Sequence, residues 1–554
     1  MRKGETMKVV QFSTYLDRMG DACLAMQEAI AALTGEGGGR LVIEPGSYDF
    51  YPDTACERFY FVSNNDKSSK CIGMPFIGGK RIEIEGNGAK LLFHGKMTPA
   101  VFDGCEDVCI RDLSVDFDRP FYSEGLVEEA SAHEVILKID AVRFPYYVCH
   151  ERLHFTGWKW DVSRILNMMQ YSPLTGDLEP ETADCFLDKY GYTAEELPNG
   201  RVRLRLRERE FPYVIRPGNV LVMVHATREN PGMVFSECRN VRIDNVTIHH
   251  SEGMAFIFQL CHNVSLTGCR IEPSENRLIS SCADATHFVN CSGDILMKDC
   301  VMESQCDDAT NVHGIYTRVQ KIEGNRLYLQ FMHNQQEGVP LYHAGDRLCL
   351  IKCGDMTAFG ECRVVSAERV NGQLCCVSVD RLPEGIAEQD GVENIDRAPE
   401  NVTITGCVTG KNRARSFLIS CRGRVRITGN ELHSNGAAIW ISGDCRYWYE
   451  SGPVEDVEVS GNQIECKNSG IVGWGTAAVE VVPELEQSPT YYHGRIVIDG
   501  NVFRKSRGPL VHARYVRELE VKNNRLICAD AQAAEILTRC CTLHNRNNTI
   551  ETDT

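Results

Sequence analysis

The sequence lacks several features that would place it in a specialised class of protein. Its 554 residues contain no run of about 18 apolar residues, so we predict no membrane-spanning helix and no membrane partner. The N-terminal segment also lacks the apolar core typical of a secretory signal, and we therefore expect a cytoplasmic protein. Basic residues are in the minority, 59 against 76 acidic, and the net charge of −17 disfavours nucleic acid as a partner.

Metal-binding cysteine motifs are missing as well. The 26 cysteines are scattered, and no CxxC pair is followed by a second CxxC or by HxxxH, so we expect no structural zinc site. We expect no cofactor. Many of the cysteines lie inside apolar strand patterns, which predicts buried, reduced thiols in a cytoplasmic protein. With 43% apolar and 24% charged residues, the chain has a globular composition.

A repeated motif organises the chain. NVRIDNVTI from Asn240 recurs as NVSLTGCRI from Asn263, NVTITGCVT from Asn401 and RIVIDGNVF from Arg495, with further copies between Arg81 and the C-terminal region. The second and fourth positions are apolar in every copy, which predicts a strand with one buried face. The seventh position holds cysteine in the middle copies and asparagine in the later ones. We expect these side chains to form a ladder inside the protein, each Asn bonding to the next.

The spacing of the copies predicts the fold. Asn240 and Asn263 begin consecutive copies that lie 23 residues apart. A turn of this length, with short strands and no helix, predicts an all-β protein, a right-handed parallel β-helix. Two long gaps in the repeat contain other strand patterns, such as RVRLRLRE from Arg201 and NRLYLQF from Asn325, which predict inserted small β-barrel modules. Asp21 predicts the start of an N-terminal helix that caps the open end of the β-helix.

We therefore expect five segments along the chain. They are an N-terminal cap with the first β-helix turns (1–120), a β-barrel module (121–232), β-helix turns with an acidic cluster (233–313), a second β-barrel module (314–398) and the C-terminal β-helix turns (399–554).

The segment from Ser280 to Gly314 carries the candidate chemistry. Asp284 is followed 23 residues later by Asp307 and then by Asp308. We expect Asp307 to lie above Asp284, with Cα atoms roughly 5 Å apart, and Asp308 to lie to one side. Stacked carboxylates raise at least one pKa, so one can donate a proton while another activates water, as glycoside hydrolysis requires. A calcium site and simple turn chemistry are the alternatives for the same cluster.

Other polar and aromatic residues are expected to bind the substrate. The aspartates are flanked by histidines and an amide, Arg415 lies on the turn after the second insert, and WYESG forms a loop whose aromatic and carboxylate groups suit a sugar. The expected substrate-binding residues are His287, Asn311, His313, Arg415, Trp448 and Glu450. Weaker candidates are Arg413, Trp440, Trp474 and Glu480.

These motifs resemble glycoside hydrolase family 110, the α-1,3-galactosidases built on a parallel β-helix. The resemblance is carried by ADATHF around Asp284, by CDDATNVHG with Asp307 and Asp308, and by WYESGP, and it spans most of the chain. It implies an inverting, metal-independent exo-hydrolase that releases terminal α-1,3-linked galactose from blood-group B type or linear Galα1-3Gal oligosaccharides. By analogy with family 28 polygalacturonases, which carry a similar trio, it also implies that Asp307 is the general acid and that Asp284 and Asp308 activate the water.

Three alternatives belong to other classes. A polygalacturonase-like or other β-helix glycosidase would need a basic subsite for its substrate's carboxylate, and no Arg-x-Lys follows His313 on the next turn. A β-helix polysaccharide lyase would need Ca²⁺ or a basic residue and would produce an unsaturated sugar. A non-enzymatic glycan-binding solenoid would not need three stacked carboxylates. The oligomeric state stays open, with a homodimer as one option.

Overall fold

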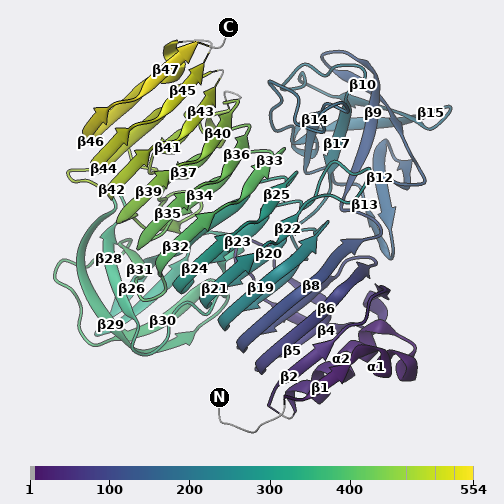
Figure 1. Ribbon diagram of the computed structural model, residues 1–554, viewed down its shortest axis with the longest axis horizontal. Coiled ribbons are helices and arrows are strands. Elements are labelled where there is room, and N and C mark those ends of the chain that lie inside the picture. Colours follow the sequence, from purple (N-terminus) through teal and green to yellow (C-terminus); the bar gives the residue numbers. More distant parts are fainter. Residues whose placement is uncertain (1–6, 36, 469–470, 506, 529–530, 553–554) are drawn as a thin grey trace.

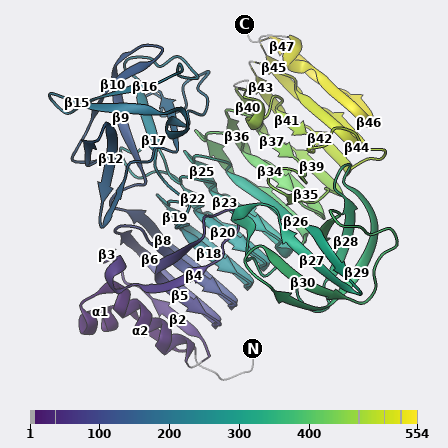
Figure 2. The same ribbon diagram turned by 180° about the vertical axis from the view of Figure 1, so that it is seen from behind.

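The computed structural model describes residues 7–35, 37–468, 471–505, 507–528 and 531–552. Most of its ordered elements are β-strands, which stack in successive turns of one long coil (Figure 1). Two β-rich modules project from opposite sides of this coil, as the two opposite views show (Figures 1 and 2).

The coil is a parallel β-helix, because each motif strand pairs in parallel with the motif strand of the next turn. Val241 faces Val264, and Val264 faces Ile295, so the copies of the motif stack in register as predicted. The motif column consists of β2 (Gly39–Val42), β6 (Lys80–Phe93), β8 (Glu106–Phe117), β19 (Arg239–Ile248), β21 (His262–Thr267), β24 (Ser292–Lys298), β32 (Pro399–Thr405), β35 (Arg424–Thr428), β39 (Asp456–Ser460), β42 (His493–Asp499), β44 (Val511–Lys522) and β46 (Ile536–Arg546).

Two more columns of strands complete each turn. The second column continues the motif strands around the coil through β3 (Ser47–Phe50), β22 (Arg270–Ile271), β25 (Val301–Glu303), β33 (Val408–Gly410), β36 (Glu431–Ser434), β40 (Gln463–Cys466), β43 (Val502–Lys505), β45 (Arg525–Cys528) and β47 (Thr549–Thr552). The third column contains β5 (Ser68–Ile77), β7 (Thr98–Asp103), β18 (Met233–Ser236), β20 (Phe256–Gln259), β23 (Thr286–Val289), β26 (Thr310–Glu323), β34 (Phe417–Ser420), β37 (Ile439–Ile441) and β41 (Val479–Val481).

Buried asparagines connect the later turns, as the seventh motif position predicts. The main-chain N–H of Asn462 donates to Oδ1 of Asn501 at 3.0 Å, and that of Asn501 donates to Oδ1 of Asn524 at 2.9 Å. The ladder begins where the N–H of Cys407 donates to Oδ1 of Asn430 at 2.8 Å. Because these side chains satisfy main-chain groups inside the coil, they fix the spacing of the turns.

The first inserted module leaves the coil after β8 and returns at β18. Its six-stranded antiparallel sheet has the order β14-β17-β9-β10-β16-β15, and a smaller sheet has the order β11-β12-β13. The strands are β9 (Tyr122–Ala130), β10 (Glu134–Ile139), β11 (Tyr146–Cys149), β12 (Arg152–Gly157), β13 (Trp160–Val162), β14 (Asn167–Tyr171), β15 (Tyr192–Leu197), β16 (Arg201–Leu206) and β17 (Val220–Val224), with the short helix α3 (Leu187–Tyr190) before β15.

The second inserted module is a closed barrel. Its antiparallel pairings run β26-β27-β30-β29-β28-β31 and return from β31 to β26. The added strands are β27 (Arg326–Phe331), β28 (Arg347–Lys352), β29 (Thr357–Arg369), β30 (Leu374–Val379) and β31 (Gly391–Asn394). Because β26 begins as a strand of the β-helix and continues into the barrel, the barrel is joined directly to the strand that follows Asp307 and Asp308.

The N-terminal region adds two helices and two further strands. The strand β1 (Val9–Gln11) pairs with β2, and β4 (Cys56–Tyr60) forms a hairpin with β5. Helix α1 (Phe12–Met19) precedes α2 (Ala22–Thr34), which starts after Asp21, whose carboxylate accepts the N–H of Leu24 at 2.9 Å. The longest helix within the described ranges has 13 residues, and no helix there could cross a bilayer. Each of the 26 cysteines is a free thiol.

Candidate active site

A cavity of about 220 Å³ opens beside the third column of strands. Eight of the nine predicted site residues line this cavity, and His313 does not. Its walls come from four parts of the chain: the turns of the β-helix, the N-terminal hairpin, the connector that returns from the first module, and the loop between β37 and β39.

The aspartates stack with a register that differs by one residue from our expectation. Thr286 faces Thr310 across β23 and β26, an offset of 24 residues, so Asp284 lies under Asp308 rather than under Asp307. The N–H of Asp308 donates to Oδ1 of Asp284 at 3.2 Å. The motif spacing did not predict this offset, because the turns between the columns differ in length. One carboxylate oxygen from each of the three aspartates lies within 4.8 Å of the other two.

Asp307 is held by two arginines. Arg228 donates to its Oδ2 at 2.7 Å, and Arg413 donates to its Oδ1 at 3.1 Å. Burial alone would raise the pKa of Asp307, but Arg413, Arg228 and Arg415 together hold it below its usual value. With these contacts in place, Asp307 is therefore a carboxylate.

Asp284 and Asp308 have the opposite tendency. Burial, together with the charge of Asp307, raises the pKa of each to about 8. Arg415 opposes this at Asp308, whose Oδ1 accepts a hydrogen bond from Nε of Arg415 at 2.7 Å. The trio thus combines one ionised carboxylate with two carboxyl groups that favour the protonated form, although all three lie side by side.

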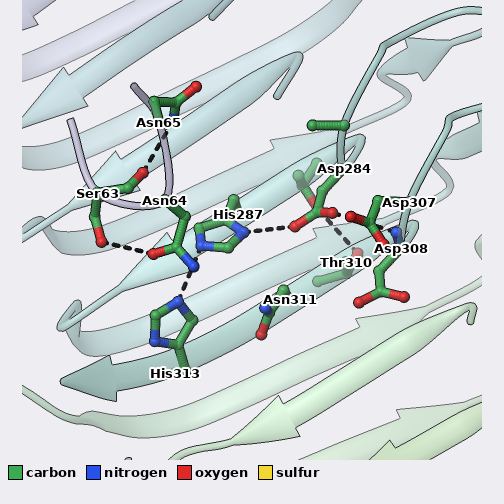
Figure 3. Close-up of polar contacts among 12 residues, drawn as sticks. Ser63, Asn64, Asn65, Asp284, His287, Asp307, Asp308, Thr310, Asn311 and His313 are labelled. Carbon is green, nitrogen blue, oxygen red and sulfur yellow. Dashed lines mark hydrogen bonds and ion pairs between the residues drawn. The ribbon is translucent and has the colours of Figure 1, made fainter. Parts of the chain in front are cut away.

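A row of buried imidazoles leads away from Asp284 (Figure 3). Oδ2 of Asp284 lies 2.6 Å from Nδ1 of His287, and Nε2 of His287 lies 2.9 Å from Nε2 of His313. His313 is 2% exposed and contacts His287, and it does not belong to the residues that line the cavity, unlike the other expected substrate-binding residues. His287 lines the cavity but makes its polar contacts with Asp284 and His313.

Glu450 closes the other side of the cavity. It lies in the short strand β38 (Glu450–Ser451), which pairs with β26. Its Oε1 accepts a hydrogen bond from Nδ2 of Asn64 at 3.2 Å, and both of its carboxylate oxygens lie 3.4 Å from Nδ2 of Asn311. The Oδ1 atom of Asn311 is buried and has no protein partner, so it is available to a hydroxyl donor.

Trp448 stands at the rim of the cavity, where it is 42% exposed. The centre of its ring lies 4.3 Å from that of His333, with the two planes tilted by 36°. Its carbonyl oxygen accepts a hydrogen bond from Nε2 of Gln336 at 2.7 Å. The carboxylate of Asp444 accepts the N–H groups of the four residues from Arg446 to Tyr449 and thereby fixes the loop. The aromatic face of Trp448 is therefore held in position and is partly open to a ligand.

The weaker candidates divide into two groups. Trp474 lines the cavity, and the guanidinium of Arg413 lies 5.2 Å from its ring. Trp440 is 8% exposed and packs under Arg415 in the same way, at 5.2 Å. Glu480 accepts hydrogen bonds from the N–H of Ala477 at 2.9 Å and from His512 and is outside the cavity lining, so its contacts are those of a structural residue.

Two polar cavity residues, Asn64 and Arg228, were not predicted from the sequence. Asn64 lies in the turn between β4 and β5, and Arg228 lies in the connector between β17 and β18. Neither belongs to a motif copy, so the periodicity carries no signal for them. That Arg228 comes shortly before a strand of the third column is the one feature that could have pointed to it.

The trio has the oxygen donors of a cation site, but its surroundings disfavour a cation. Three carboxylates within 4.8 Å could hold a metal ion. However, three guanidinium groups surround them, and Arg413 is itself bound by Asp184 of the first module through Nε at 2.7 Å. A divalent ion would have to displace these arginines or share the carboxylates with them.

Comparison with known proteins places the chain in a family. Residues 123–221 match the model of GLAA-B beta-barrel domain I, and residues 326–392 match that of GLAA-B beta-barrel domain II. The chain is 30% identical to alpha-1,3-galactosidase A of Shewanella woodyi, over 92% of this chain and 83% of that protein. It is also 30% identical to alpha-1,3-galactosidase B of Bacteroides thetaiotaomicron, over 94% of this chain and 86% of that protein.

Solved structures resemble the chain more distantly. An exopolygalacturonase from Thermotoga maritima aligns over 99% of this chain and 92% of its own, with 12% identity and a TM-score of 0.40, a likeness too distant to support an inference. The relatives that share 30% identity over most of both chains, together with the two matched barrel domains, establish that this chain belongs to the α-1,3-galactosidases of glycoside hydrolase family 110.

Proposed function

We propose that this protein is an exo-glycosidase that removes terminal α-1,3-linked galactose from blood-group B type or linear Galα1-3Gal oligosaccharides. The observation that carries the proposal is the trio Asp284, Asp307 and Asp308, which opens into a cavity in a chain of this family. At about 220 Å³, the cavity is smaller than most ligand pockets, which suits one terminal sugar rather than a segment within a polymer.

The trio provides both groups that hydrolysis needs. One carboxyl must give a proton to the leaving oxygen, while another takes a proton from the attacking water. We assign the role of general acid to Asp307, as the family 28 analogy implies. We assign to Asp284 and Asp308 the role of holding and activating the water. Arg228 and Arg413 keep Asp307 in its ionised form before substrate binds. This assignment therefore requires that the hydroxyls of the substrate draw these guanidinium groups away from Asp307. Burial then raises the pKa of Asp307, and the group takes up a proton.

The remaining cavity residues suit galactose. We propose that Trp448 stacks on the apolar face of the ring and that Glu450, Asn311 and Arg415 bond to its hydroxyls. His287 acts through Asp284, with which it makes its contact.

We further propose that the reaction inverts the anomeric configuration and needs no metal. The separation of the carboxylates, within 4.8 Å between nearest oxygens, is shorter than the range of about 6.5–9.5 Å found for many inverting enzymes. Direct observation of the first-formed anomer is therefore the right test of inversion.

Several structural proposals accompany this function. We infer that the coil is right-handed, that α2 shields its first turn from solvent, and that the boundaries at 120, 232, 313 and 398 separate the coil from its two modules. We also propose that the protein acts in the cytoplasm and has no nucleic-acid partner.

The function is tested with p-nitrophenyl α-galactoside and a panel of Galα1-3, Galα1-4 and Galα1-6 oligosaccharides, with and without a branching fucose. We expect galactose to be released from the α-1,3 compounds, with β-galactose as the first product in NMR spectra. Cleavage of oligogalacturonides instead would favour a polygalacturonase-like enzyme. Products that absorb in the ultraviolet would indicate a lyase.

A further inference from the structure

The row from Asp284 to His313 ends at a group that can only accept a hydrogen bond. Nδ1 of His313 lies 2.7 Å from the carbonyl oxygen of Gly314. A carbonyl has no proton to give, so Nδ1 of His313 must carry one. In a neutral imidazole the other nitrogen, Nε2, then carries none.

This end point fixes the protons along the whole row. The Nε2 atoms of His313 and His287 face each other at 2.9 Å, so one proton must lie between them, since two lone pairs at this distance repel. With His313 neutral, that proton belongs to His287, and a neutral His287 has a bare Nδ1. This bare nitrogen lies 2.6 Å from Oδ2 of Asp284, which must therefore hold the next proton.

The same count holds in each alternative form. If His287 is an imidazolium, Asp284 is ionised, and the proton has only moved along the row. If Asp284 is ionised and both histidines are neutral, two bare nitrogens face each other. The geometry therefore requires the three side chains to share one proton beyond those of two neutral imidazoles.

We propose that His287 and His313 are positioning residues of the hydrolytic reaction, a relay that receives the proton which Asp284 takes from the attacking water. The proposal rests on the proposed function, because it assigns Asp284 to the water. It also agrees with the assignment of the acid role to another aspartate, since the proton on Oδ2 of Asp284 is shared with His287.

The reaction then balances as follows. An O–H bond of water breaks, its oxygen bonds to the anomeric carbon, and its proton goes to Oδ1 of Asp284. At the same time the proton on Oδ2 passes to Nδ1 of His287. The bond from the anomeric carbon to the leaving oxygen breaks, and that oxygen takes the proton of Asp307. Release of one proton from the row to solvent restores Asp284 and His287, and uptake of one proton by Asp307 restores the acid.

The charged groups around the row suit this transfer. Glu450 lies 3.6 Å from Nε2 of His313 and stabilises an imidazolium there. At His287, Glu450 and Asp307 favour the imidazolium, whereas Arg228 opposes it. Arg228 and Arg415 face Asp284 and favour its ionised form, whereas Asp307 and Glu450 oppose it; Asp308 lies directly above Asp284. Burial raises the pKa of Asp284 to about 8 and lowers that of His287 to about 4, which places the shared proton on Asp284 at rest.

The first test is spectroscopic and needs no substrate. Protein labelled with ¹⁵N-histidine is studied by two-bond ¹⁵N–¹H correlation, and the signals are assigned with His287→Gln and His313→Gln. We expect His313 to be neutral with its proton on Nδ1 and His287 to be neutral with its proton on Nε2. A proton on Nε2 of His313 with a bare Nδ1 would overturn the relay, whether or not the protein releases galactose.

The second test is the pH dependence of kcat/KM on an α-1,3-linked substrate. In His287→Gln the relay is lost, so Asp284 must itself be ionised against its raised pKa. We expect kcat/KM to fall by roughly 10²-fold or more and the acidic limb of the profile to move to higher pH by about one unit or more. His313→Gln keeps an oxygen that can accept the N–H of His287, and we expect its acidic limb to move less than that of His313→Leu.

His493→Gln is the matched control, because His493 is also a buried imidazole but lies outside the cavity lining. Its acidic limb should match that of the unmodified protein. If His287→Gln lowers kcat/KM equally at every pH and leaves the limb unchanged, His287 has a purely structural role and the proposal fails. A protein that is inactive on every glycoside but shows the expected tautomers would refute the proposed function and leave the proton count intact.

Discussion

The main-chain N–H of Asp308 donates a hydrogen bond to the carboxylate of Asp284, 3.2 Å away on the preceding turn. This contact ties the backbone of the Asp307–Asp308 pair to the side chain of the third aspartate. It also leaves Asp307 to one side, where Arg228 and Arg413 can reach it. Asp307 and Asp308 therefore have different surroundings, although they are neighbours in the sequence.

Replacing Asp307 by Asn should abolish galactose release. The amide cannot donate a catalytic proton, and we expect a loss in kcat of about 10³-fold or more. The fold should tolerate the change, because Arg413 still has its ion pair with Asp184 and Arg415 still has its ion pair with Asp308. Asp184→Asn is the control, since it removes a charge beside the same arginine but outside the cavity lining, and it should retain most of the activity. Survival of activity in Asp307→Asn would place the acid elsewhere.

Binding of galactose should be accompanied by proton uptake. The guanidinium groups hold the pKa of Asp307 down in the empty site, and hydroxyl groups that replace them release it. Calorimetric titration near neutral pH in buffers of different ionisation enthalpy should give an uptake approaching one proton per galactose. No uptake would transfer the acid role to Asp308, which already favours its protonated form.

Asp308→Asn should become relatively more stable as the pH rises. The pKa of Asp308 is raised to about 8, whereas an unfolded Asp titrates near 3.9. Between these values the folded protein binds a proton that the unfolded chain has lost, so stability falls with rising pH, by at most about 1.4 kcal/mol per pH unit. The amide removes this dependence and can still accept the hydrogen bond of Arg415. The difference in Tm between variant and parent, measured from pH 5 to 8, should increase; a constant difference would contradict the raised pKa.

Chelation should leave the activity unchanged. The three arginines already balance the charge of the trio, so no cation is needed to hold the carboxylates together. We expect equal rates before and after treatment with EDTA and dialysis. A loss that added Ca²⁺ restores would show that the trio is a cation site.

The asparagine ladder should contribute measurably to stability. Asn462→Leu would leave the N–H of Asn430 and the carbonyl of Ile427 without their present partners inside the coil. The cost of such buried groups is about 1–3 kcal/mol each, so thermal unfolding should occur at a clearly lower temperature. Gln463→Leu, at the next and exposed position, should change Tm little. Equal effects of the two substitutions would contradict a role for the ladder.

The sequence predicted the coil because its evidence is local and repeated. Each motif copy alternates apolar and polar residues, and the pairing of Val241 with Val264 follows from that alternation. The asparagine column was predictable for the same reason. The register of Asp284 was not, because it depends on the length of the turns between columns, which carry no repeat.

The cavity residues on the turns of the coil and in the WYESG loop were predictable from local motifs, whereas those in the N-terminal hairpin and in the connector from the first module were not. Asp284 and His287 follow from a single turn, whereas Asn64 and Arg228 reach the cavity only through the folding of distant segments. The position of His313 next to His287 depends on the pairing of β23 with β26, in which His287 faces Asn311 and Val289 faces His313, and the turn lengths that set this pairing carry no repeat.

The wall beside Trp448 is assembled from three remote stretches of chain. The N–H of Asn64 donates to the carbonyl of Gln335 at 2.7 Å, and the side chain of Gln336 holds the carbonyl of Trp448. A polypeptide still emerging from the ribosome cannot build this wall until residue 450 is available to residues 64 and 336. Activity therefore requires the complete, folded chain. A truncated or partly folded chain should bind its sugar poorly, even where single turns of the β-helix have formed.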